Sequence, residues 1–240
     1  MKKRYNRIEK NEEHPQKTEF TMNLKDKKIN CLGDSITEGV GTSEKSKIYL
    51  NLLKERAELA EVRNYGKSGT RIARQIHVTD HPFDQDFNLR AETMDDDADI
   101  VVVFGGTNDF GHGEVPIGSM DDRTLYTFYG AMHALVLKLL HKYTDKKLVF
   151  MTPLHRMNEN ASANMQKFEG VSAKPLYDYV KAIREVCEYY SVPVLDLYRE
   201  SGIAGNVKAV CDIYMPDGLH PNDLGHEIIA NKLQKFLENL

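Results

Sequence analysis

A serine, an aspartate–histidine pair and an asparagine are the residues of this chain whose types and spacing could carry out chemistry. Ser35 ends the short turn Gly33-Asp34-Ser35. Asp217 and His220 lie three residues apart, far downstream. An imidazole can take the proton of a serine hydroxyl, and a carboxylate can hold that imidazole in orientation. Asn108 adds an amide donor for a developing oxyanion, so the set has what acyl transfer through a serine requires.

The elements that must position these residues follow from the alternation of short apolar runs with amphipathic segments. Five runs predict strands: Lys28–Leu32, Glu61–Tyr65, Ile100–Phe104, Lys147–Thr152 and Val192–Asp196. Apolar residues at helical spacing predict four helices: Tyr49–Leu59, Asp122–Tyr143, Lys174–Tyr190 and Asp223–Leu237. This order is typical of an α/β fold. We expect a three-layer α/β/α sandwich around a five-stranded parallel sheet, with a flavodoxin-like strand order.

The candidate residues fall at one edge of this predicted sheet. In open α/β sheets, ligands bind outside the carboxyl ends of the strands. Ser35 follows the first predicted strand, the glycine-containing segment 64–70 follows the second, and Asn108 follows the third. Asp217 and His220 precede the last predicted helix. We therefore expect all of these groups to converge on one rim.

Four sequence blocks together resemble the SGNH-hydrolase, or GDSL-esterase, family. They are Gly33-Asp34-Ser35, Asn64 to Gly69, Gly106 to Asp109, and Asp217 to His220. Each block is weak evidence by itself, but all four stand in the family's order and at its strand positions. The match runs from about Lys28 to the C-terminus. The residue after the first block is isoleucine, where the family's name has leucine, which is a conservative departure.

The resemblance implies a role for each matched residue. Ser35 would be the nucleophile, His220 the general base and acid, and Asp217 the group that orients the imidazole. It also implies an oxyanion hole of three donors: the Ser35 backbone N–H, the Gly69 backbone N–H and the Asn108 side chain. Gly69 fits the family's glycine better than Gly66 does. The usual Gly-x-Ser-x-Gly elbow is absent, which argues against an ordinary α/β-hydrolase.

The substrate is indicated less specifically. Asp34, beside the nucleophile, and His155 and Arg156, after the fourth strand, are candidates for contacts with its polar part. The long connections 76–99 and 153–173 are expected to border the site. Because 153–173 is largely polar and no interfacial amphipathic helix is evident, a short acyl group on a soluble alcohol is favoured over bulk lipid. Acetyl esters of carbohydrates are the leading expectation.

Several residues also have simpler interpretations. Ser35 could cap a helix, and Asp217 with His220 could form a local turn. His226 is expected to face solvent on the last helix, and His112 and Glu114 to lie in a surface loop. A non-catalytic flavodoxin-like module that binds a sugar or nucleotide is the competing class, although neither Gly-x-Gly-x-x-Gly nor a P-loop is present. A metal-dependent phosphoesterase is a third possibility, but no metal or other cofactor is expected.

The amino-acid composition limits the number of domains and the classes of partner that the protein can have. The 240 residues are 41% hydrophobic and 28% charged, which suits one domain over residues 28–240 behind a loosely attached polar arm, 1–27. The net charge of -4 argues against a nucleic-acid partner. No apolar run predicts a signal peptide or membrane span, so we expect a cytoplasmic protein that acts on a small-molecule ester. An odd cysteine count, Cys31, Cys187 and Cys211, predicts reduced, mostly buried thiols.

Overall fold

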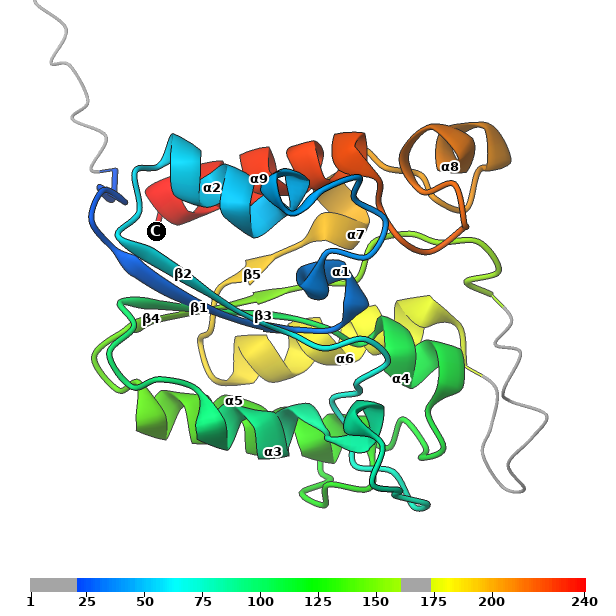
Figure 1. Cartoon of the computed structure of the whole chain (residues 1–240). Helices are drawn as coiled ribbons and strands as arrows, with labels where there is room; N and C mark the ends of the chain where they lie inside the picture. Colours follow the sequence, from blue (N-terminus) through cyan, green and yellow to red (C-terminus); the bar gives the residue numbers. More distant parts are fainter. Residues whose placement is uncertain (1–20, 161–173) are drawn as a thin grey trace, which may run out of the picture.

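The computed structural model describes residues 21–160 and 174–240, and its centre is a five-stranded parallel sheet (Figure 1). The strands are β1 (Lys28–Gly33), β2 (Glu61–Gly66), β3 (Ile100–Phe104), β4 (Lys147–Met151) and β5 (Val194–Leu195). They lie in the order β2-β1-β3-β4-β5, and each neighbouring pair is parallel. The predicted fold class is therefore confirmed, although β5 is shorter than predicted.

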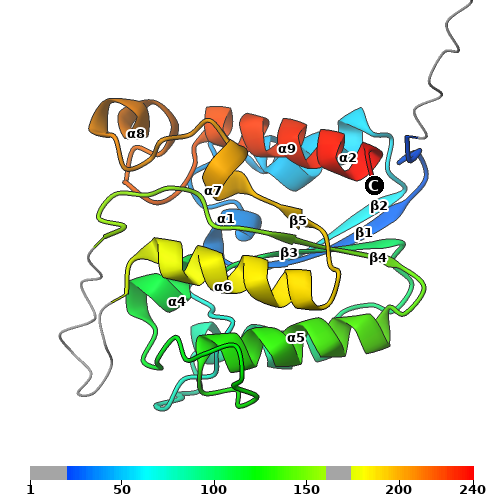
Figure 2. The same cartoon turned by 180° about the vertical axis from the view of Figure 1, so that it is seen from behind.

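Helices cover both faces of the sheet, as the two opposite views show (Figures 1 and 2). One layer contains α3 (Phe87–Arg90), α5 (Phe128–Lys142) and α6 (Leu176–Tyr189), and the other contains α2 (Tyr49–Arg56) and α9 (Asp223–Glu238). Four short helices complete the described chain: α1 (Ser35–Glu38), α4 (Thr107–His112), α7 (Leu197–Glu200) and α8 (Lys208–Tyr214). Single 3₁₀ turns occur at Lys45–Lys47, Pro82–Asp84 and Ala91–Thr93.

The sheet divides the core into two apolar layers, because successive side chains of a strand point to opposite faces. Val101 and Val103 of β3 belong to the cluster packed under α5 and α6. Val102 and Phe104 belong to the cluster under α2 and α9. All of β3 is buried, so the strand that leads to Asn108 is held on both sides.

Two helix predictions need correction. α5 begins at Phe128 and not at Asp122. The Asp122 carboxylate instead accepts a hydrogen bond from Ser119 N at 3.0 Å in a turn, and the Thr127 side chain caps the helix. His226 is fully buried and does not face solvent. It lies on the buried face of α9 with Ile229, Leu233 and others at helical spacing, so the predicted face was rotated away from the real one.

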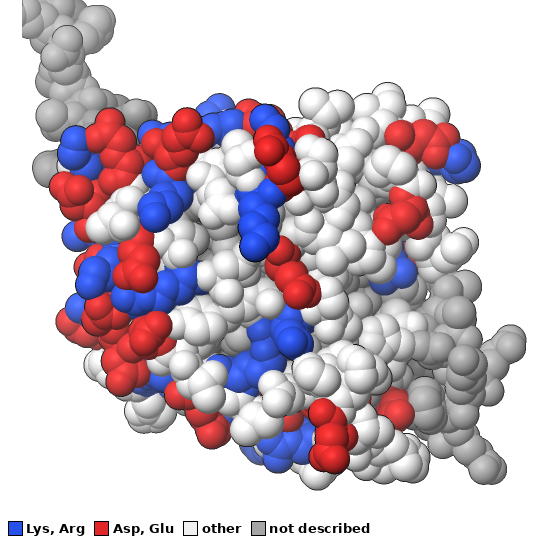
Figure 3. All heavy atoms as spheres, in the orientation of Figure 1, with Lys and Arg blue, Asp and Glu red and all other residues white. Residues whose placement is uncertain are grey.

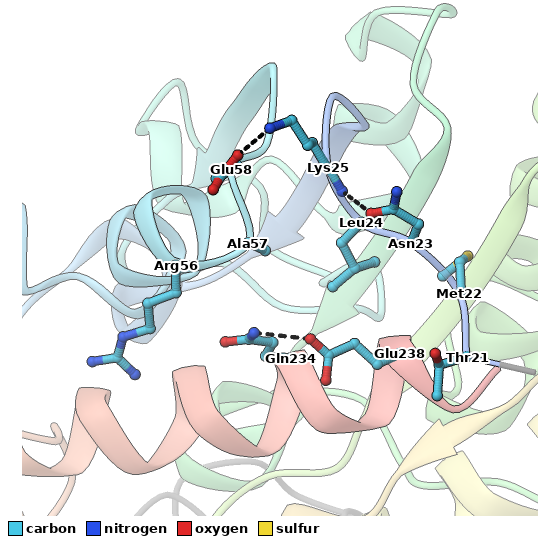
Figure 4. Close-up of a pocket in the computed structure, with 10 residues that line it drawn as sticks. All are labelled: Thr21, Met22, Asn23, Leu24, Lys25, Arg56, Ala57, Glu58, Gln234 and Glu238. Carbon is cyan, nitrogen blue, oxygen red and sulfur yellow. Dashed lines mark hydrogen bonds and ion pairs between the residues drawn. The ribbon is translucent and has the colours of Figure 1, made fainter. Parts of the chain in front are cut away.

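Part of the predicted N-terminal arm, residues 1–27, can be compared with the structure. Residues 1–20 lie outside the described residues, but residues 21–27 pack against the body of the molecule (Figure 4). Met22 N donates to the Glu238 carbonyl at 2.7 Å, and the Leu24 side chain is buried. The Lys25 ammonium forms an ion pair with Glu58. The segment from residue 21 is thus fixed to the ends of α2 and α9.

Charged side chains are unevenly distributed on the face of the molecule that Figure 3 shows. They crowd the side where the strands begin, where Arg63 pairs with Glu61, Asp95 and Asp97. They are sparser toward the side of α8, near the carboxyl ends of the strands. None of the helices in the described ranges has the length and apolarity that a bilayer crossing requires.

Candidate active site

Ser35 is the first residue of α1, in a tight turn at the carboxyl end of β1. A methyl group added at Gly33 would lie 2.0 Å from Thr37 Oγ1, so this turn needs the glycine. The Asp34 carboxylate caps α1 by accepting from Ile36 N at 3.0 Å. The Ser35 backbone N–H has no hydrogen-bond partner among residues 21–160 and 174–240.

His220 lies opposite Ser35 on the segment that enters α9. Its Nε2 is 3.0 Å from Ser35 Oγ, and its Nδ1 is 2.5 Å from Asp217 Oδ2. The other carboxylate oxygen of Asp217 accepts from the backbone N–H groups of His220 at 2.7 Å and Leu219 at 2.9 Å. The structure thus joins Ser35, His220 and Asp217 in one chain of hydrogen bonds, although Ser35 and His220 are 185 residues apart.

The surroundings of Asp217 favour its ionised form. Partial burial pushes the pKa of this carboxyl up, but the hydrogen bonds from His220 and Leu219 outweigh burial and leave the pKa below its ordinary value. An ionised carboxylate at Nδ1 keeps the proton there, so Nε2 is free to accept the Ser35 hydroxyl proton. The arrangement can therefore activate a serine for attack.

The two glycines of the second block differ in what their backbones do. Gly66 N already donates to Asn64 Oδ1 at 2.8 Å. Gly69 has a left-handed φ of 76°, and its N–H has no partner in the part of the chain that the structure describes. Of these two glycines, Gly69 is therefore the one whose N–H is available to a ligand.

Asn108 and Asp109 lie in the first turn of α4, directly after β3. The Asn108 amide nitrogen donates one hydrogen to the Thr70 carbonyl at 3.0 Å, and it carries a second hydrogen. Asp109 accepts from Ile72 N at 3.0 Å and from Ala73 N at 2.9 Å. Burial raises the pKa of Asp109 to about 6, against these hydrogen bonds, which lower it. The two residues tie α4 to the segment that follows Gly69.

Arg71 is a further part of the site region that sequence reasoning did not identify. Its buried guanidinium donates to the Asp84 carboxylate at 2.5 Å, and its NH1 lies 3.1 Å from His112 Nδ1 and 3.4 Å from the His112 carbonyl oxygen. Burial lowers the pKa of His112 to about 4, so the ring is neutral at pH 7. His112 therefore anchors the end of α4 and does not lie in a free surface loop. The nearest sequence signal was the position of Arg71 just after the second block.

The residues after β4 divide between two environments. The Arg156 guanidinium donates to the Thr107 carbonyl at 3.3 Å and to Thr107 Oγ1 at 3.1 Å, next to Asn108. His155 points elsewhere. Its ring centroid lies 3.7 Å from the ring centroid of Tyr198, and its Nδ1 forms a hydrogen bond with the buried Glu159 carboxylate at 2.9 Å. His155 lines a separate hollow of about 210 Å³ beside α7. The predicted substrate contact by His155 is not supported, whereas Arg156 does border the site.

Asp34 also has a different place from the one predicted. Its side chain is buried beneath Ser35, where it caps α1, and it is 2% exposed. Burial raises the pKa of Asp34 to about 7, which the hydrogen bond from Ile36 N partly offsets. These contacts describe a residue that shapes the nucleophile turn from within and not one that meets a substrate.

One hollow in the described structure lies away from this site. It measures about 490 Å³ and is formed by residues 21–25, the end of α2 and the end of α9 (Figure 4). None of its lining residues belongs to the hydrogen-bonded chain of Ser35, His220 and Asp217. In the described ranges, no three His, Cys, Asp or Glu side chains gather as ligands for a metal ion.

A flavodoxin-like sheet with a serine, a histidine and an aspartate joined at its carboxyl edge defines the class of SGNH hydrolases. The model of the GDSL-like Lipase/Acylhydrolase family matches residues 31–228, which is most of the chain. The protein therefore belongs to the GDSL-like lipase/acylhydrolase family. Hydrolase activity of the esterase or lipase type follows from this membership.

Solved structures give the same assignment of the fold. A protein from Lactobacillus plantarum is 32% identical, with 89% of this chain and 97% of that chain covered and a TM-score of 0.76. The lipase/acylhydrolase from Enterococcus faecalis is 23% identical over 88% and 95% of the two chains, with a TM-score of 0.59. An acetyl xylan esterase is 22% identical over 87% and 98%, also at 0.59. A search of curated proteins found no match.

Proposed function

We propose that the protein is a serine esterase that cleaves a short-chain acyl ester through an acyl-Ser35 intermediate. The observation that carries the proposal is the continuous hydrogen-bonded chain from Ser35 Oγ through His220 to Asp217. A serine that only capped a helix would not need this pair. Here Asp34, and not Ser35, supplies the cap of α1.

The reaction runs in two steps. His220 Nε2 takes the hydroxyl proton of Ser35 as Oγ bonds to the ester carbonyl carbon, and the carbonyl oxygen becomes an oxyanion. The donors for that oxyanion are Ser35 N–H, Gly69 N–H and the second amide hydrogen of Asn108. His220 then gives its proton to the leaving alcohol as the carbon–oxygen bond breaks. Water, deprotonated by His220, releases the acid and restores Ser35.

Two features favour a small uncharged ester. On the face seen in Figure 3, charged side chains are sparser toward the carboxyl ends of the strands. The fold of an acetyl xylan esterase is similar, and we place acetyl esters of carbohydrates first among the substrates to be tried.

The decisive experiment compares wild type with Ser35→Ala on p-nitrophenyl acetate at neutral pH, with chelator present. Loss of the nucleophile should lower kcat on the order of a million-fold, as in other serine hydrolases. Ser43→Ala, which changes a serine bonded to Asp223 at the surface, is the matched control and should keep wild-type turnover. A fluorophosphonate should add its mass to the peptide that contains Ser35 in wild type and not in Ser35→Ala.

Equal turnover in wild type and Ser35→Ala would overturn the proposal. It would favour the alternative that the protein is a sugar- or nucleotide-binding module. Hydrolysis of p-nitrophenyl phosphate that is lost when chelator is added would favour the metal-dependent phosphoesterase instead.

A further inference from the structure

Phe83 lies directly against Gly69. A methyl group added at Gly69 would lie 3.0 Å from Cβ and 3.6 Å from Cγ of Phe83. Phe83 belongs to the 3₁₀ turn Pro82–Asp84, within the connection between β2 and α3. Because the Gly69 N–H has no partner in the described ranges, the aromatic side chain borders an unoccupied backbone donor.

The Phe83 ring is held in place by its neighbours. The His81 ring lies with its centroid 4.1 Å away, and the Arg71 guanidinium carbon lies 5.4 Å from the ring centroid. Arg71 is itself fixed by an ion pair with Asp84. The Arg71 side chain is 5% exposed and the Asp84 side chain is 4% exposed. A ring with such support can act as a rigid wall.

The same contacts connect Phe83 with the helix that carries Asn108. Arg71 NH1 lies within hydrogen-bonding distance of the ring nitrogen Nδ1 of His112 and of the His112 carbonyl oxygen. His112 is the last residue of α4. Phe83, Arg71 and His112 thus form a continuous wall beside Gly69 and α4. We call it the Phe83 wall.

The directions of the groups on the ester carbonyl carbon indicate which of them faces the Phe83 wall. His220 must reach the leaving alcohol, so the alcohol lies toward α9, in the layer of α2. The oxyanion lies among Ser35, Gly69 and Asn108. The acyl chain is the remaining substituent of the tetrahedral carbon, so it points away from both His220 and the oxyanion. It leaves past the edge of the oxyanion hole, where the Phe83 wall flanks Gly69.

We propose that Phe83 closes the far end of the acyl subsite and thereby restricts the enzyme to short acyl groups. The inference rests on the proposed esterase function and assigns its chain-length limit to one residue. In this arrangement the ring occupies the space that the methylenes of a longer acyl chain would need.

The test is a p-nitrophenyl ester series from acetate to octanoate, in which only the acyl chain varies. Wild-type kcat/KM should fall with chain length. In Phe83→Ala, the ratio of kcat/KM for octanoate to that for acetate should rise at least tenfold, since each buried methylene contributes about 0.8 kcal/mol, or roughly fourfold. Phe83→Leu should fall between the two. Leu89→Ala, which shortens an exposed apolar side chain in α3 of the same connection, is the matched control and should keep the wild-type ratio.

The outcomes separate the inference from the proposed function. A wild-type profile that does not fall with chain length, or an unchanged ratio in a Phe83→Ala variant that still hydrolyses acetate, overturns the role of Phe83 alone. If Phe83→Ala does not fold, as judged by circular dichroism, the ratio in Phe83→Leu decides. If no ester in the series is hydrolysed in a Ser35-dependent way, the esterase proposal fails and this inference fails with it.

Discussion

The side-chain amide of Asn108 donates to the Thr70 carbonyl oxygen at 3.0 Å and so joins the segment after β3 to the segment after β2. Gly69 immediately precedes Thr70, so the two donors proposed to flank Ser35 are fixed relative to each other before any substrate arrives. Preorganised donors stabilise developing charge without a cost of reorganisation. Asp109, through its bonds to Ile72 N and Ala73 N, strengthens the same connection.

Asn108→Ala should lower kcat by roughly a hundred- to a thousandfold, with a much smaller change in KM, because the lost donor acts mainly on the oxyanion. Steady-state kinetics on p-nitrophenyl acetate would check this. Urea unfolding should be measured in parallel, because the Thr70 carbonyl also loses its partner. A kcat within tenfold of wild type would remove Asn108 from the oxyanion hole.

Asp217→Asn should lower kcat by roughly ten-thousandfold. An amide NH₂ facing Nδ1 would force the proton of the neutral ring onto Nε2, which could then no longer accept from Ser35. The matched control is Asp212→Asn, an exposed carboxylate of α8 paired with Lys208. Comparable losses in both variants would point to a general charge effect and not to the orientation of His220.

His226 should make the fold sensitive to acid. Tyr49 N donates to His226 Nδ1 at 3.1 Å, and burial lowers the pKa of His226 to about 4. An unfolded histidine titrates near 6.5, so at pH 5 the unfolded state binds a proton that the folded state does not. Stability from this group is complete above about pH 6.5 and is lost as pH falls toward 4, with a cost of about 2 kcal/mol by pH 5.

Urea unfolding of wild type and His226→Gln at pH 7.5 and pH 5 would measure this effect. The variant should lose less stability than wild type over that interval. His141→Gln, at an exposed position of α5, should follow wild type. Identical pH dependence in wild type and His226→Gln would show that His226 does not carry the acid sensitivity.

Gly66→Ala should cost more stability than an ordinary glycine substitution. The added methyl would lie 2.1 Å from the Glu38 backbone nitrogen, so β2 and α1 would have to separate, and Ser35 would move with α1. Such overpacking costs about 1–3 kcal/mol, and esterase activity should fall as well. Gly202→Ala is the control: nothing lies within 4 Å of its added methyl, and only its φ of 78° opposes the change. Equal activity in the two variants would contradict the close packing of β2 on α1.

The long elements of this fold were predictable because they repeat a pattern. Every strand of the sheet and the four longest helices follow from apolar spacing, and the four sequence blocks located Ser35, Gly69, Asn108 and Asp217 with His220. The short helices could not be found in this way. α1, α3, α4, α7 and α8 span only four to seven residues, which is too short for a helical period to stand out.

The predictions that failed depend on the direction in which a single side chain turns, which the position of a residue at the sheet edge does not determine. Asp34 and His155 were assigned to the substrate because each stands at the correct sheet edge, but their side chains turn toward Ile36 N and Glu159. Phe83 carried no signal, since its contact with Gly69 is made by a turn inside a long connection. The burial of His226 could have been predicted from the sequence, because His226 shares the helical spacing of the buried residues of α9.

The separation of 185 residues between Ser35 and His220 has a consequence for how activity arises during folding. The pairs of β1 with β2 and of β1 with β3 involve no residue of α9, and the turn with Ser35 directly follows β1. The imidazole, however, reaches Ser35 only when α9 docks on α2 and buries residues such as Ile229 and Leu233. A chain whose last helix is undocked keeps its nucleophile but lacks the base. Ester turnover would thus report whether α9 is docked, whereas circular dichroism reports the secondary structure of the chain.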